Sequence, residues 1–262
     1  MKVDKRDLIL ESIIQAYLAE GAPIGSSELG TRMSANIPAS TIRVYFKKLS
    51  DEGAITQLHI SGGRIPTQTA MRYYWGERLN LAQTLEISDA DALSFLARDA
   101  GVYCMIFGVS NLKLEGVFSV KDRFLLLDFG QESMTLRFNV KAQKFLSNLI
   151  GMSLDELEAV CAQVGLGELR SKIREFKRSR IYFQENAKVA FEMFDDERLK
   201  IALEPSFEKY FKSNLSFEPF FEPGFMGLKM PAKFEGKNAV MICAGSVYND
   251  YEKFLNNIKE VA

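Results

Sequence analysis

The sequence predicts a multidomain α+β protein with a helical N-terminal module followed by a larger α+β region. Apolar residues follow helical spacing in three segments before residue 53, and a glycine-rich, strand-like segment comes next. Beyond it, short apolar runs alternate with helical patterns. A chain of 262 residues also exceeds one typical domain. We expect a module at 1–75, linking helices at 76–100 and an α+β domain at 101–262.

The first helix is predicted between residues 4 and 20. Gly21 is expected to end it, and Pro23 prevents its continuation. One face of this helix carries apolar residues at i, i+3, i+4, i+7 and i+8, namely Leu10, Ile13, Ile14, Tyr17 and Leu18.

Two further helices are predicted before residue 53. The serine pair Ser26 and Ser27 supplies an N-cap for a short second helix. Pro38 is expected to open the third helix, and Gly53 to end it. The apolar stripe of the third helix consists of Ile42, Tyr45, Phe46 and Leu49.

The other face of the third helix is polar and basic, with hydroxyl groups first and cations after them. In a helix-turn-helix, the first half of the second helix of the motif enters the major groove, where short polar side chains and Arg reach base edges. Thr41 and Arg43 are therefore the candidates for base contact, and Ser40, Lys47 and Lys48 for phosphate contact. The alternative is a charged helix face that is simply solvated.

A wing is predicted after the third helix. Residues 54–60 have strand composition, and residues 61–64 read Ser-Gly-Gly-Arg before a second short apolar segment. The glycines allow a close approach of the backbone to DNA, and Arg64 is placed to enter a minor groove or contact a phosphate. The alternative is an ordinary hairpin with a solvated arginine.

Composition excludes several classes of function. His59 is the single histidine, and Cys104, Cys161 and Cys243 lie far apart in apolar stretches, so neither a metal site, a disulfide framework nor a Ser-His-Asp triad is expected. No phosphate loop or hydrolase motif occurs, so we expect neither an enzyme nor a cofactor. No segment approaches the roughly 18 apolar residues of a membrane span, which predicts a cytoplasmic protein.

The charge is nearly balanced. Residues 1–82 hold ten Lys and Arg against eight Asp and Glu, while the whole chain has a net charge of −1. Binding to DNA would therefore depend on a local basic face, doubled by dimerisation, and not on net charge.

After the module, helical spacing continues over residues 68–98. Its aromatic cluster, which includes Trp75, is interpreted as packing in preference to a stacking platform for bases. Apolar runs at 102–107, 114–120, 124–129 and 134–140 then predict an antiparallel sheet. Ser153 and Glu156 form a capping-box sequence ahead of a helix, and a strand at 239–245 precedes a terminal helix. Residues 170–180 carry six cations. The alternatives for this run are a solvated helix face, the rim of a dimer interface and a contact to DNA that flanks the binding site.

Four motifs in the N-terminal module resemble the heat-inducible transcription repressor family, HrcA. They read GAPIGSSEL at 21–29, STIR at 40–43, HISGGRIPT at 59–67 and RYY at 72–74. The resemblance implies a homodimeric bacterial repressor of chaperone operons that binds an inverted-repeat operator in double-stranded DNA, is released on heat stress and is kept active by a GroEL-type chaperonin. It also implies that the second domain is GAF-like.

The chain departs from the family pattern in two ways. Most members resemble Arg-Asn-Asp-Met where this chain reads Arg43-Val44-Tyr45-Phe46, which changes a position that faces the groove. Family members are usually longer, so we expect a shortened dimerising segment at about 145–215, and a smaller interface would make dimerisation more sensitive to temperature. The alternative function is a winged-helix regulator that binds a metabolite in its GAF-like domain.

Overall fold

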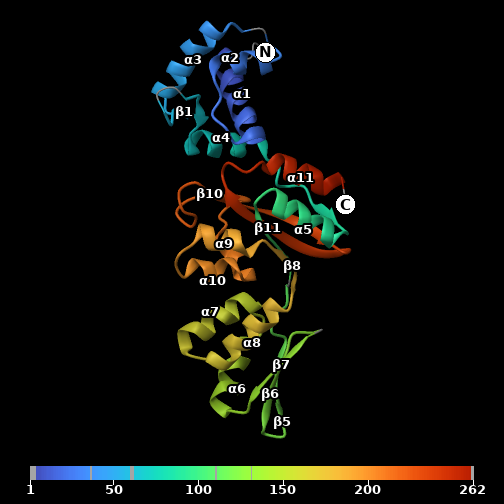
Figure 1. Ribbon diagram of the computed structural model, residues 1–262. Coiled ribbons are helices and arrows are strands. Elements are labelled where there is room, and N and C mark those ends of the chain that lie inside the picture. The colour runs from blue at the N-terminus through green and yellow to red at the C-terminus, as the bar shows by residue number, and fades with distance from the viewer. Residues whose placement is uncertain (1–3, 36, 60–61, 110, 131, 261–262) are drawn as a thin grey trace. The chain divides into compact units, whose positions relative to one another are not determined.

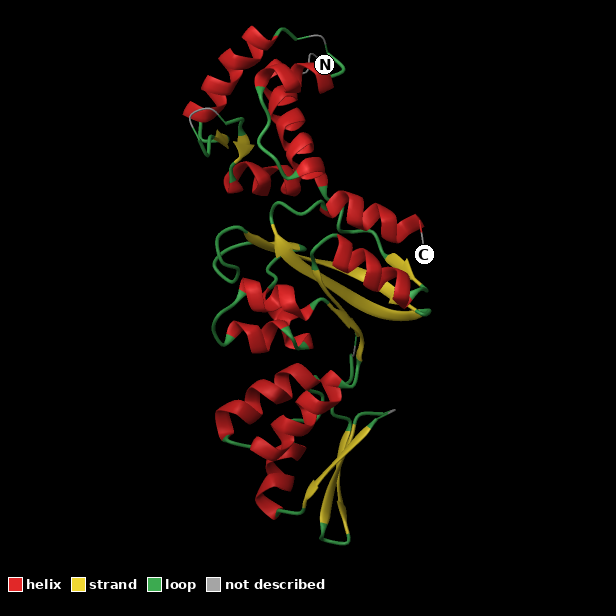
Figure 2. Ribbon diagram, in the orientation of Figure 1, coloured by secondary structure: helices red, strands yellow, loops and turns green. Residues whose placement is uncertain are grey.

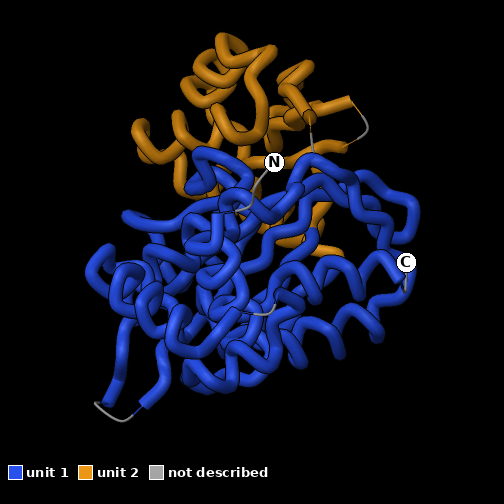
Figure 3. Tube along the Cα trace, turned by 90° about the horizontal axis from the view of Figure 1, so that it is seen from above, with its two compact units in different colours: residues 1–106, 183–262 blue, residues 107–182 orange. Residues whose placement is uncertain are grey.

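The computed structural model describes residues 4–35, 37–59, 62–109, 111–130 and 132–260. Helices and strands are mixed along the chain, so the predicted α+β class is confirmed (Figures 1 and 2). The chain forms two compact units (Figure 3). Unit 1 comprises residues 1–106 and 183–262, and unit 2 comprises residues 107–182. Within the described residues, none of the helices is both long and apolar enough to cross a bilayer.

Unit 1 begins with a module of four helices and one short hairpin. Its elements are α1 (Lys5–Glu20), α2 (Ser26–Arg32), α3 (Ala39–Asp51), β1 (Ile55–Thr56), β2 (Ile65–Pro66) and α4 (Gln68–Arg78). Gly21 ends α1 at a φ of 66°, where a residue without Cβ carries no steric penalty. One apolar core joins the three first helices to β1, and its buried members are Ile9, Ile13, Ile24, Leu29, Ile37, Ile42, Phe46, Leu49 and Ile55.

The predicted serine N-cap of α2 is wrong by one residue. Gly25 occupies the N-cap position, and no side chain caps the helix. Ser26 instead lies in the first turn, and its Oγ accepts a hydrogen bond of 3.1 Å from Arg43 Nε on α3. The hydroxyl is thus used to connect two helices and is not available to the free amides of its own helix.

The part of unit 1 that follows α4, which we call its second part, has a six-stranded sheet at its centre. The strands follow the order β3-β10-β11-β4-β8, and β9 pairs with β10. Its strands are β3 (Leu85–Ile87), β4 (Tyr103–Gly108), β8 (Ile181–Glu185), β9 (Leu215–Ser216), β10 (Phe225–Phe234) and β11 (Lys237–Ser246). Strands β10 and β11 pair antiparallel over ten residues each. The pattern at 68–98 did not predict β3, which is only three residues long and pairs in parallel with β10.

Helices cover both faces of this sheet (Figure 1). One face carries α5 (Ala90–Asp99) and α11 (Tyr251–Glu260), and the other carries α9 (Ala187–Met193) and α10 (Arg198–Ala202), followed by a 3-10 helix at Pro205–Tyr210. Phenylalanines fill the space around α9 and α10, where Phe194, Phe207 and Phe221 are buried. The ring centroid of Phe221 lies 5.8 Å from that of Phe194 and 5.9 Å from that of Phe207. Bulky rings therefore occupy this side of the sheet.

Unit 2 has its own core and its own three-stranded antiparallel sheet, β5-β6-β7. Its elements are β5 (Gly116–Val120), β6 (Phe124–Asp128), β7 (Ser133–Arg137), α6 (Val140–Ser147), α7 (Leu154–Val164) and α8 (Gly167–Arg178). The prediction of one sheet from four apolar runs is wrong, because β4 belongs to the larger sheet. Every residue of β4 is buried, as in a strand covered on both faces, whereas β7 alternates between buried and exposed positions.

Three local predictions in the second region are confirmed. Ser153 and Glu156 form the reciprocal capping box at the start of α7. The strand and terminal helix expected near the C-terminus are β11 and α11. The three cysteines are free and buried, and burial raises the pKa of the Cys243 thiol, which donates a hydrogen bond to Cys104 Sγ at 3.5 Å.

Helix α4 is anchored to the second part of unit 1 through one buried indole. Trp75 is fully buried, and its Nε1 donates to the carbonyl oxygen of Val247 at 2.7 Å. The indole also packs edge-on against Tyr251 of α11, with ring centroids 5.6 Å apart. The aromatic cluster of α4 therefore serves packing at Trp75, as the sequence indicated.

We expect Trp75→Phe to lower the free energy of unfolding by about 1–3 kcal/mol, because the buried Val247 carbonyl loses its donor. Urea denaturation of the full chain measures the change. Tyr73→Ala, on the same helix but 72% exposed, should shift stability by no more than about 0.5 kcal/mol. Equal losses in the two variants would show that the indole hydrogen bond does not anchor α4.

Candidate nucleic-acid interface

The outward face of α3 carries the cations that the sequence singled out. Ser40, Arg43, Lys47 and Lys48 are exposed, and Thr41 is half-buried beside the apolar stripe. The structure thus brings four of the predicted residues onto one accessible surface and leaves Thr41 at its edge. We name this surface, Ser40, Arg43, Val44, Lys47 and Lys48, the α3 outer face.

The helix pair α2 and α3 is connected at this surface by the hydrogen bond from Arg43 to Ser26. Ser27 is exposed at the start of α2, next to Ser26. The connection holds the Arg43 guanidinium near the first turn of α2, with its remaining N–H groups available. This hydrogen bond to the neighbouring helix restrains the position of an exposed guanidinium.

The cations of the α3 outer face are not neutralised by carboxylates. Among the residues that the structure describes, no acidic side chain forms an ion pair with Arg43, Lys47 or Lys48. Two other cations of the module are paired with carboxylates: Arg6 contacts Glu52 at 2.6 Å, and Arg32 contacts Glu20 at 2.5 Å. Three cations without an ion pair among the described residues therefore lie together on the α3 outer face, although the net charge of the chain is small.

The hairpin after α3 is held against the segment before α2. Ile24 N donates to Arg64 O at 3.0 Å, and Arg64 N donates to Ile24 O at 2.9 Å. A Cβ on Gly63 would lie 2.5 Å from the Ile24 carbonyl carbon, so this close approach requires glycine. Arg64 is half-buried. Of the predicted wing tip at residues 61–64, residue 61 lies outside the described residues, as does residue 60 before it. His59 is exposed.

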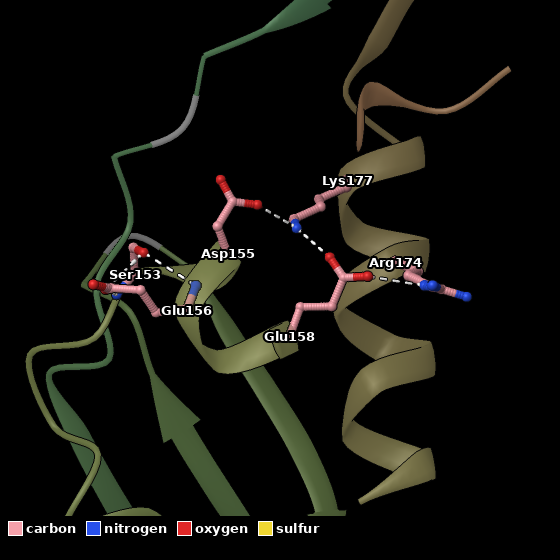
Figure 4. A network of polar contacts seen from close by, with 6 residues as sticks. All are labelled: Ser153, Asp155, Glu156, Glu158, Arg174 and Lys177. Carbon is pink, nitrogen blue, oxygen red and sulfur yellow. Dashed lines mark hydrogen bonds and ion pairs between the residues drawn. The ribbon is translucent and has the colours of Figure 1, made fainter. Parts of the chain in front are cut away.

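Two cations of the basic run at 170–180, Arg174 and Lys177, form ion pairs within unit 2 (Figure 4). Lys177 Nζ lies 2.6 Å from Asp155 Oδ1 and also contacts Glu158, and Arg174 Nε lies 2.9 Å from Glu158 Oε1. Glu158 is buried, so it needs these cations to compensate for its desolvation. The carboxylates that pair with these two cations come from α7.

No metal centre is built into the described part of the chain, since no three His, Cys, Asp or Glu side chains gather in a suitable group there. The α3 outer face is exposed and carries three cations, Arg43, Lys47 and Lys48.

A family model described as the HrcA C-terminal domain matches residues 75–262, which is more than half of the chain. The chain therefore belongs to the HrcA family.

Relatives in that family carry the name heat-inducible transcription repressor HrcA. The protein of Helicobacter pylori strain 26695 is 29% identical over 271 aligned residues, which cover 98% of this chain and 96% of that protein. The protein of Chlamydia felis is 47% identical over 66 residues, which are 25% of this chain and 17% of that protein. The Helicobacter protein is thus similar in length, and the Chlamydia protein is longer. A solved structure of a hypothetical protein covers 99% of this chain at 20% identity, with a TM-score of 0.48.

We expect Lys47→Ala to weaken binding to random-sequence duplex DNA and to reduce the slope of log affinity against log salt by about 0.9 for each bound subunit, because one phosphate contact is lost. Fluorescence anisotropy over a salt series measures the slope. Arg174→Ala on α8 is the matched control and should leave the slope unchanged. An equal effect of Arg174→Ala would show that α8 contacts DNA.

Proposed function

We propose that this protein is a DNA-binding negative regulator of heat-shock gene transcription. In this proposal α1, α2, α3 and the hairpin form a winged helix-turn-helix, and α3 enters the major groove. The observation that supports it most directly is the α3 outer face, whose cations are without carboxylate partners among the described residues. Membership of the HrcA family supplies the regulatory role, since the named relatives are heat-inducible repressors.

Base reading is assigned to the first half of α3. Arg43 and Thr41 would contact base edges, Ser40, Lys47 and Lys48 would contact phosphates, and Ser26 and Ser27 would contact the backbone at the start of α2. Arg64 would reach the DNA from the hairpin. The order of these groups along the chain agrees with a helix that enters the groove by its N-terminal half.

The second part of unit 1 is proposed to be GAF-like and to act as a scaffold without a metabolite. The alternative, a small-molecule sensor, would need space beside the sheet. Instead Phe207 and Phe221 are buried there, and a Cβ on Gly227 of β10 would lie 2.4 Å from the Phe221 ring. Rings packed this closely to the strand favour the repressor over the sensor.

A homodimer is proposed because two modules are needed to give a weakly charged chain enough phosphate contacts. Unit 2 offers a surface for self-association. The outward side of its sheet carries Phe118 and Phe124, which are 53% and 50% exposed, with Val120 opposite Phe124 in the strand register. Covering these side chains with a second copy would remove apolar area from water.

Release on heat stress follows in this proposal from loss of the dimer. Operator affinity depends on dimer concentration, so warming that weakens self-association also empties the operator. The dimerising segment predicted at 145–215 overlaps unit 2 from residue 145 to residue 182. A GroEL-type chaperonin, proposed as a partner, would act by raising the fraction of folded repressor. We place the protein in the cytoplasm, where its DNA lies.

We expect Arg43→Ala to cost about 1–3 kcal/mol of binding free energy on the preferred operator and to relax sequence preference, because a guanidinium contact to a base edge is lost. Competition binding against random duplex DNA measures both effects. Val164→Ala, a substitution of an exposed residue outside the module, is the control and should leave both the affinity and the sequence preference unchanged. If Arg43→Ala distinguished the operator from random DNA as well as the wild type does, α3 would not be the element that reads the bases.

Phe118→Glu should raise the dimer dissociation constant about tenfold or more, because each copy then places a charge in the apolar surface. Sedimentation velocity over a concentration series and a temperature ramp measures it. Phe95→Glu is the control, since Phe95 is 67% exposed but lies on α5, outside unit 2 and outside residues 145–215. Unchanged self-association in Phe118→Glu, or DNA release by an intact dimer on warming, would contradict this mode of heat response.

A further inference from the structure

Val44 interrupts the otherwise polar α3 outer face with an aliphatic side chain. It is 69% exposed, whereas the other apolar residues in the centre of the helix, Ile42, Phe46 and Leu49, are buried. At roughly 100° per residue, Val44 lies about 200° around the helix from Ile42. Its side chain therefore points directly away from the core of the module.

Neither folding nor helix formation accounts for valine at this position. An exposed valine buries little area on folding, and its branched Cβ lowers helix propensity relative to alanine or lysine. Its neighbours on the helix surface, Ser40, Arg43, Lys47 and Lys48, are polar or charged. Val44 is thus the apolar centre of a surface whose rim is suited to phosphates.

The sixth residue of α3, Val44, belongs to the half of the helix that approaches base edges if α3 is a recognition helix. Valine has neither a donor nor an acceptor in its side chain, so it cannot read the hydrogen-bonding pattern of a base pair. The C5-methyl group of thymine is the apolar group that base edges present in the major groove. Contact between the two excludes water from both surfaces.

The geometry points to Val44 as a specificity-determining residue that packs against a thymine C5-methyl group in each operator half-site. This inference rests on the proposed function, in which α3 enters the major groove. It adds one requirement to the operator: a thymine next to the base pair that Arg43 contacts, since the two residues are adjacent on the helix. A polar residue at this position would instead select by hydrogen bonding.

The test uses an operator obtained by selecting random-sequence duplex DNA with the full-length wild-type protein. Each thymine of the selected half-site is then replaced in turn by deoxyuridine, which removes only the methyl group. At one thymine position, replacement by deoxyuridine should lower the affinity of the wild type about fourfold for each half-site. This is the loss expected when a methyl-sized group is removed from an apolar contact. Val44→Ala should bind the thymine duplex and the deoxyuridine duplex with equal affinity.

Two further variants separate contact from general effects. Val44→Thr keeps one branch methyl and the side-chain shape, so part of the response to deoxyuridine should remain. Val164→Ala, a substitution of a similarly exposed valine outside the module, should respond like the wild type. Because Val44 is exposed, its variants should keep the melting temperature of the wild type, which thermal denaturation checks.

Three outcomes would overturn the inference. The first is an equal deoxyuridine response in the wild type and Val44→Ala at every thymine. The second is weaker self-association of Val44→Ala without DNA, which would make Val44 a contact between copies. The third is failure of the wild type to enrich any sequence, which would overturn the proposed function as well. The first two leave the proposed function intact, so the two failures are distinguishable.

Discussion

The burial of one apolar stripe on α3 is the constraint on which the module depends. Ile42, Phe46 and Leu49 pack into the core formed with α1 and α2, and this packing determines how the helix is rotated about its axis. The opposite side, with Arg43 and Lys47, is consequently held towards solvent. A small rotation would cost apolar burial, so the orientation of the α3 outer face is maintained by the same contacts that fold the module.

The distribution of charge in this protein also depends on local contacts between side chains. Cations with a neighbouring carboxylate, such as Arg32 and Lys177, stabilise contacts between helices and contribute little external field. Cations for which the described residues supply no carboxylate remain on the α3 outer face. A protein with almost no net charge therefore keeps a basic surface, and a dimer would double the number of phosphate contacts without adding non-specific attraction elsewhere.

Helix α4 connects the module to the second part of unit 1 through specific polar contacts. Besides the Trp75 hydrogen bond, Arg72 pairs with Glu218 at 2.7 Å and Arg78 pairs with Glu252 at 2.9 Å. Tyr248 also donates to the Pro66 carbonyl oxygen at 3.1 Å, next to the base of the hairpin. These contacts join the module to the second part of unit 1 at several separate points.

The sequence alone determined the first three helices and their apolar stripes, the capping box of α7 and the terminal helix, because these features depend on periodicity and on residues a few positions apart. It did not place β4 in the large sheet or reveal β3, since strand pairing joins residues distant in the chain, and three residues carry too little pattern. Only the tertiary structure decided that Ser26 accepts a hydrogen bond from Arg43 instead of capping α2. It also decided that Arg174 and Lys177 of α8 pair with acids of α7. Those outcomes depend on which side chains folding brings together, and the linear order of residues does not specify such distances.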